Sequence, residues 1–279
     1  LPISEGYAMS WSDFEYSTAN GQPVTLYEFV RGDTQFFRYT NADQDITAAG
    51  AVWQQQAISD GGLSVGAGDS MDITLPTTNP VAMLFRGLPP SQPVRVRIHR
   101  WHVGDSQGEF RTVWIGSITE VKREAIDRTR LVTASLASTF TRSGLRLTWG
   151  RACPYSLYDH NCKVSPAAFG VGGLVISALD GVSITVNLPA GSPDGWFSGG
   201  YLEWLADGVT ERRGLRAQSG NVLGLFGGSA GLSVGQVVAV FPGCDRTITT
   251  CNDKFNNVLN YGGQPHMPGK SPYQIIKLF

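Results

Sequence analysis

Apolar and polar residues alternate along much of this chain, which is the pattern of half-buried β-strands. The clearest run covers residues 94–99, where valine and isoleucine alternate with arginine and histidine. Similar runs cover residues 112–115, 182–186 and 236–240. Gly, Asp, Asn and Pro interrupt the pattern about every ten residues, as they do between the short strands of sandwiches and barrels. The pattern predicts a mainly β protein with two β-barrel or sandwich-like domains.

Helical signals are few and short. Residues 46–59 fit either a short helix or a loop. Residues 252–260 are predicted to form a helix, because a threonine at 249 or 250 is available as a cap and apolar side chains recur at helical spacing. Two glycines follow and would end that helix. We therefore expect only short helices between the strands.

The stretch 141–152 contains two glycines and lacks a clear strand pattern, and we place a domain boundary there. It divides the chain into a β-rich domain of residues 1–145 and a second domain of residues 146–279. A glycine-rich stretch at about 168–240 predicts a small β-barrel inside the second domain.

The formal net charge of −1 conceals two oppositely charged stretches. Residues 1–85 carry ten acidic and two basic side chains, and residues 86–151 carry twelve basic and five acidic ones. The two stretches either pair within one chain or meet between subunits. Charged residues make up only 16% of the chain, against about 25% in typical soluble domains, which suggests surfaces covered by partners. The near-zero total argues against specific nucleic-acid binding.

No run of 18 apolar residues is present, so we expect no membrane span. The N-terminal residues lack the basic stretch and apolar core of a signal peptide, and we expect none. Disulfides need an oxidising compartment, so the lack of a visible export signal weighs against them.

The chain has four cysteines, arranged as two pairs far apart in the sequence. Cys153 and Cys162 are separated by eight residues, and Cys244 and Cys251 by six. Both pairs lie among Pro, Asn, Asp and Gly, which predicts loops. The residues leave four possibilities open: an iron–sulfur cluster, two disulfides, a zinc ion or free thiols. Structural zinc usually takes cysteines two to four residues apart, so the loose spacing favours a cluster, whose cysteines reach separate irons.

A cysteine peptidase is an alternative interpretation of the same residues. Cys153 or Cys251 would be its nucleophile, and His160 or His266 its base. None of these residues lies in a recognisable nucleophile motif, and the four cysteines have similar surroundings. A lone histidine on a loop is also more often a surface hydrogen-bonding group than a catalytic one.

The residues around the cysteines resemble those of a known family. The matching segments are Cys-Pro-Tyr from 153, Gly-Trp-Phe-Ser-Gly-Gly from 195, Pro-Gly-Cys-Asp-Arg-Thr from 242, Phe-Asn-Asn from 255 and Asn-Tyr-Gly-Gly from 260. They resemble tail tip and baseplate hub proteins of long-tailed phages (siphoviruses) and gene transfer agents, including BR0599-like proteins, with the phage lambda tail tip protein as a more distant relative. The likeness is strongest over residues 149–270 and weaker over 1–140.

This resemblance implies a structural protein of the virion tail tip rather than an enzyme. Members form a homotrimeric ring between the distal tail protein and the central tail fibre or hub protein, and the tape measure protein is a further candidate partner. Relatives hold a [4Fe–4S] cluster, whose ligands here would be Cys153, Cys162, Cys244 and Cys251, with zinc or no metal as the alternative. A receptor-binding tail module is the remaining alternative function.

Overall fold

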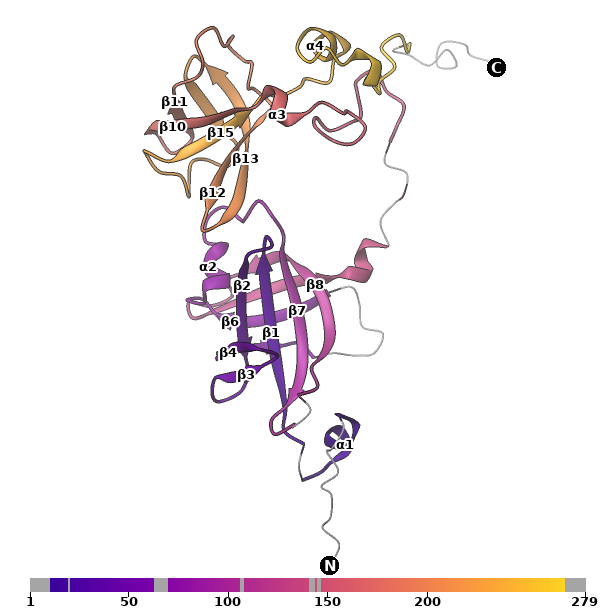
Figure 1. Cartoon of the computed structure of the whole chain (residues 1–279), viewed down its shortest axis with the longest axis vertical. Coiled ribbons are helices and arrows are strands. Elements are labelled where there is room, and N and C mark those ends of the chain that lie inside the picture. Colours follow the sequence, from indigo (N-terminus) through magenta and orange to yellow (C-terminus); the bar gives the residue numbers. More distant parts are fainter. Residues whose placement is uncertain are drawn as a thin grey trace, which may run out of the picture. The chain divides into compact units, whose positions relative to one another are not determined.

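The computed structural model describes residues 11–19, 21–62, 70–105, 108–140, 144 and 147–268. The chain divides into two compact units, which we describe separately. The first comprises Leu1–Arg142 with Ala206–Val209, and the second comprises Ser143–Leu205 with Thr210–Phe279. The predicted boundary between residues 145 and 146 lies outside the described residues. Strands dominate both units, which confirms the prediction of a mainly β fold (Figure 1).

The first unit is built on a nine-stranded sheet with the order β3-β4-β2-β1-β7-β8-β9-β6-β5. All its pairs are antiparallel except β2 with β4. Figure 1 shows β1, β7 and β8 running side by side. The strands are β1 (Pro23–Arg31), β2 (Gln35–Thr40), β3 (Ile46–Ala48), β4 (Ala51–Gln55), β5 (Ser59–Asp60), β6 (Ser70–Pro76), β7 (Val94–His102), β8 (Arg111–Lys122) and β9 (Arg128–Ser135).

Three short helices accompany this sheet: α1 (Trp11–Tyr16), α2 (Pro80–Leu84) and the 3-10 helix η1 (Leu136–Thr139). Asn79 caps α2 by accepting a hydrogen bond from the Val81 amide at 2.8 Å. Strand β1 is buried on both faces, because Tyr27 and Phe29 enter the main apolar core while Leu26 enters a second one. The alternation predicted for residues 94–99 is confirmed in β7 from Val94 to Ile98, whereas His99 on the polar side is also buried.

The expectation of a helix or loop over residues 46–59 is wrong. This stretch forms β3, β4 and the start of β5, with Ile46 opposite Trp53. Ala49 and Gly50 form the turn between β3 and β4, and both have positive φ, at 51° and 73°. Two successive residues with positive φ match the twist of a tight hairpin, and an alanine in the first position hides this signal in the sequence.

The acidic and basic stretches pair within this unit at three places. Glu28 on β1 lies opposite Arg97 on β7, and their side chains form an ion pair at 3.2 Å. The other two pairs join Asp33 to Arg95 at 2.7 Å and Asp72 to Arg130 at 3.2 Å. At these positions, the oppositely charged stretches therefore meet within one chain.

The second unit contains a closed barrel with the strand order β10-β11-β14-β13-β12-β15. Small helices α3 (Pro166–Phe169), α4 (Ile248–Asp253) and the 3-10 helix η2 (Val258–Asn260) flank it in sequence (Figure 1). Apolar side chains that alternate along the strands fill the barrel, among them Ile176, Leu202 and Val240. The strands are β10 (Val171–Leu179), β11 (Ser183–Val186), β12 (Tyr201–Ala206), β13 (Val209–Ser219), β14 (Val222–Leu225) and β15 (Val237–Phe241).

The helix predicted over residues 252–260 is misplaced. Helix α4 begins four residues earlier, because Thr247 rather than Thr249 or Thr250 is its cap and accepts a hydrogen bond from the Thr250 amide at 3.2 Å. It ends at Asp253, and Asn256 then adopts a positive φ of 47°, which an α-helix cannot accommodate. In the described part of the chain, no helix has both the length and the apolar character needed to cross a membrane.

Candidate functional site

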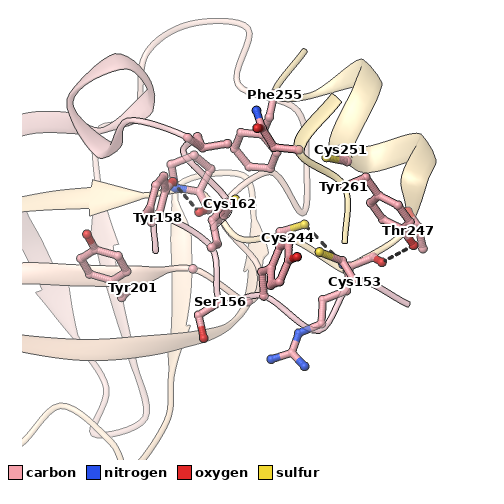
Figure 2. A pocket seen from close by; sticks show the side chains of 18 residues that line it. Cys153, Ser156, Tyr158, Cys162, Tyr201, Cys244, Thr247, Cys251, Phe255 and Tyr261 are labelled. Carbon is pink, nitrogen blue, oxygen red and sulfur yellow. Dashed lines mark hydrogen bonds between the residues drawn. The ribbon is translucent and has the colours of Figure 1, made fainter. Parts of the chain in front are cut away.

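All four cysteines line one cavity of about 220 Å³ in the second unit (Figure 2). None is joined in a disulfide. Cys251 is buried, and the other three thiols are half-buried. Aromatic side chains complete much of the wall, including Tyr158, Tyr201, Phe255 and Tyr261. The fold thus brings together the four residues that the sequence singled out.

The closure of the barrel explains how the two cysteine pairs meet. Cys162 precedes β10 and Cys244 follows β15, with some eighty residues between them. Strands β10 and β15 are antiparallel neighbours, with Val171 opposite Val240. The chain therefore enters and leaves the barrel at adjacent strands, and the two pairs lie just beyond those ends.

Hydrogen bonds within the first cysteine loop fix its shape. The Asp159 carboxylate accepts from the Cys162 amide at 2.6 Å through Oδ1 and from the Ser156 amide at 3.0 Å through Oδ2. Such side-chain turns are typical of aspartate in loops. At the other end, the Cys153 amide donates to the Arg246 carbonyl at 3.0 Å, which ties this loop to the second one.

The second cysteine pair lies partly on a helix, which corrects the prediction that both pairs lie on loops. Cys251 belongs to α4, as Figure 2 shows, while Cys244 lies in the loop before it. Asp245 accepts hydrogen bonds from the Thr247 amide at 2.9 Å and hydroxyl at 2.8 Å, and Thr247 caps the helix. The Arg246 amide points at the Cys244 sulfur at 3.3 Å. Backbone N–H groups directed at sulfur are a usual feature around cluster ligands.

Glycines allow the segments of the site to approach backbone to backbone. A Cβ atom on Gly200 would lie 2.8 Å from the Gly243 nitrogen and closer still to the Phe241 carbonyl oxygen. A Cβ atom on Gly262 would overlap the ring of Tyr155. Gly200 of the Gly-Gly motif and Gly243 of Pro-Gly-Cys thus have a steric reason, whereas Gly199 has a positive φ of 74° and open space around it.

Lys254, which no sequence motif singles out, fastens α4 to two other segments. Its ammonium group donates to the Trp196 carbonyl at 2.5 Å and to the Gly243 carbonyl at 2.7 Å. It also lies over the Trp196 ring, 4.6 Å from the centroid. Burial lowers the pKa of Lys254, while negative charge at Cys244 and Asp245 raises it. The Lys254 ammonium group therefore connects the end of α4 to Trp196 in the glycine-rich segment and to Gly243 next to Cys244.

The thiols disfavour one another's ionisation. Burial raises the pKa of Cys251, and charge on the other three thiols raises it further. Burial also raises the pKa of Cys244; the Arg246 amide opposes this, while Asp245, Cys162 and Cys153 add to it. A bound cationic metal centre reverses such a preference, because it stabilises thiolates directly.

Four thiols around one cavity are a donor set that could hold a polynuclear cluster. Among the described residues, no three His, Cys, Asp or Glu side chains converge closely enough to hold one metal ion. The four thiols instead surround a shared cavity. A cluster binds each thiolate through a different iron, so it needs thiols around a volume rather than around a point.

The two histidines considered as peptidase bases lie elsewhere. His160 and His266 are both exposed, and neither lines the cavity with the cysteines. Catalytic cysteines also usually have a lowered pKa, whereas that of Cys251 is raised. The structure thus gives the peptidase interpretation no nucleophile–base pair at this site.

Comparisons with known proteins agree with the resemblance seen in the sequence. The family model described as "Baseplate hub protein, N-terminal attachment domain" matches residues 17–165, more than half of the chain. A second model, "Phage conserved hypothetical protein BR0599", matches residues 195–271. The first match includes one cysteine pair and the second match includes the other.

A solved structure titled "Virion of native gene transfer agent (GTA) particle" contains a similar fold, with a TM-score of 0.73. The alignment covers 94% of this chain and 93% of that chain at 20% sequence identity. No curated protein matches the chain. Because a family model spans more than half of its length, the chain belongs to the family of phage baseplate hub proteins, structural components of the virion tail.

Proposed function

We propose that three copies of this chain form a ring at the tail tip that joins the distal tail protein to the central fibre or hub protein, with the tape measure protein as a further partner. A [4Fe–4S] cluster bound by Cys153, Cys162, Cys244 and Cys251 would fasten the segments around the cavity. When bound, such a cluster supplies a covalent link among four thiolates. Family membership supports the structural role rather than an enzymatic one.

One observation carries the cluster proposal: thiols from two segments some eighty residues apart line the same cavity. The Arg246 amide directed at the Cys244 sulfur and the cationic link from Lys254 add the polar surroundings that a charged cluster requires. Zinc remains the alternative occupant, and the wide spacing within each cysteine pair favours it less.

Apolar side chains on the outside of the barrel support the proposed assembly. Val175 on β10 and Val237 on β15 are cross-strand neighbours, and 48% and 57% of their surfaces are exposed. Phe226 is 59% exposed. Exposed apolar surface of this kind, on a chain with few charges, is typical of proteins covered by partner subunits.

The cluster is tested on protein purified without oxygen, by its visible spectrum and by assays of iron and acid-labile sulfide. We expect a broad band at about 400 nm and about four iron and four sulfide per chain. Cys251→Ser should lose most of this iron, whereas the matched change Ser156→Ala, at another residue of the cavity wall, should keep it. Wild-type protein with four reactive thiols and no iron would refute the cluster.

Assembly is tested separately by sedimentation velocity. The proposal predicts a species of three times the chain mass of 30.1 kDa, and Val175→Glu combined with Val237→Glu should shift it towards the monomer. A wild-type chain that stays monomeric at high concentration, alone and with its distal tail partner, would refute the ring and leave the cluster result unaffected.

A further inference from the structure

Asn257 contacts both cysteine pairs at once. Its side-chain Nδ2 donates to the Cys162 carbonyl at 2.6 Å and lies 3.9 Å from the Cys162 sulfur. Its backbone amide donates to the Cys251 carbonyl at 2.9 Å, and its own carbonyl accepts from the Cys251 thiol at 3.3 Å. All of these contacts join protein atoms, and they link the first cysteine loop to the segment around α4.

A further hydrogen bond fixes the orientation of the Asn257 amide. Its Oδ1 atom accepts from Asn260 Nδ2 at 2.6 Å, which turns the NH₂ group towards Cys162. The position therefore needs a side chain that accepts on one side and donates on the other. Asparagine meets this requirement, whereas the nearly isosteric aspartate at neutral pH only accepts.

We propose that Asn257 is a positioning residue that sets the separation of Cys162 and Cys251 before any cluster is bound. Held between the loop before the barrel and helix α4, it spares the incoming cluster part of the cost of ordering these segments. The role of the positioned thiols rests on the proposed function, whereas the positioning itself involves only this chain's own atoms and is tested on iron-free protein.

Two substitutions separate donation from space-filling. Asn257→Ala removes the donor and leaves a gap, while Asn257→Asp keeps the shape and turns a carboxylate oxygen towards the Cys162 carbonyl. If Asn257 merely fills space, Asp is the milder change. If it acts as a donor, Asp is at least as disruptive as Ala. Asn256→Asp is the matched control, because it makes the same change at an adjacent exposed side chain.

The main measurement is the modification rate of each thiol in reduced, iron-free full-length protein, resolved by peptide mass spectrometry. We expect Asn257→Asp to speed modification of Cys162 and Cys251 about tenfold, in line with one lost buried hydrogen bond, with smaller changes at Cys153 and Cys244. Iron-loaded Asn257→Asp and Asn257→Ala should both release iron to a chelator faster than the wild type, and the Asp variant should be at least as fast as the Ala variant. Asn256→Asp should match the wild type in both assays.

The inference is overturned if Asn257→Asp behaves like the control, if Ala is clearly worse than Asp, or if all four thiols respond equally. Should both variants fail to fold, Asn260→Ala gives a second test, since losing the orienting bond should speed modification of the same two thiols to a smaller extent. If wild-type protein binds no iron while the Asn257 variants still show faster modification of Cys162 and Cys251 than of the other two thiols, the cluster is refuted and the positioning role stands.

Discussion

Replacing Gly200 by alanine is the sharpest test of how the four-cysteine site is built. The new Cβ atom would lie 2.8 Å from the Gly243 nitrogen and from the Pro242 carbonyl carbon, and closer still to the Phe241 oxygen, whereas ordinary contacts begin at 3.4 Å. All three neighbours are backbone atoms, so no rotamer change can relieve the overlap. The segment that leads into Cys244 must therefore move.

The expected cost follows from this geometry. Overpacking costs about 1–3 kcal/mol when side chains can adjust, and a rigid backbone on both sides places Gly200→Ala at the upper end, at about 3 kcal/mol. For a unit of this size, the loss lowers the unfolding midpoint by roughly 10 °C. Because the movement is transmitted to Cys244, iron content should fall as well.

Calorimetry and iron assays on Gly200→Ala measure both effects, with Gly172→Ala as the matched control. A Cβ atom on Gly172 meets nothing within 4 Å, so that variant should stay within about 1 kcal/mol of the wild type. If Gly200→Ala also stays within that range and keeps its iron, close backbone packing does not hold the site together, and the steric reasoning fails.

Two further predictions concern charged groups. Lys254→Met should lower the free energy of unfolding by about 2–3 kcal/mol, because it leaves two carbonyls without their charged donor. Urea unfolding measures this loss, with Lys163→Met at an exposed lysine as the control. Equal losses in the two variants would contradict the prediction. Burial lowers the pKa of His99 to about 4, below the unfolded value of about 6.5, so the unfolded chain binds the extra proton and stability should fall from pH 6.5 towards 4. His99→Gln should flatten this dependence in urea unfolding measured at several pH values, and an unchanged slope would show that other groups cause it.

Much of the strand pattern could be predicted, because alternation is a local signal that burial on one face enforces. The runs at 94–99 and 182–186 are strands for that reason. Short strands that depend on their turn are harder to recognise, as β3 and β4 show: Ala49 occupies a turn position with positive φ where glycine or asparagine is expected. The start of α4 was misplaced because three threonines compete as its cap, and the tertiary setting selects Thr247.

The candidate site was only partly accessible to sequence reasoning. Four cysteines with none left over suggest a shared site, and the surrounding motifs resemble those of baseplate hub proteins. Lys254 gave no such signal, and Asn257 stood out only as part of the Phe-Asn-Asn segment, because each makes a contact with a residue far away in the sequence, at 58 and 95 positions. Their roles depend on which backbone carbonyls the fold places next to them, and composition and periodicity do not contain that information.

Barrel closure also limits what a bound cluster contributes to stability. A link across a loop of some eighty residues would by itself stabilise a chain by about 4–5 kcal/mol through loop entropy. Here the pairing of β10 with β15 already closes that loop. Most of this entropy is therefore lost when the barrel folds, and the cluster's share comes from ordering the short segments that carry the cysteines. We therefore expect a cluster at this site to stabilise those segments locally, and we expect barrel closure to contribute the larger loop-entropy term.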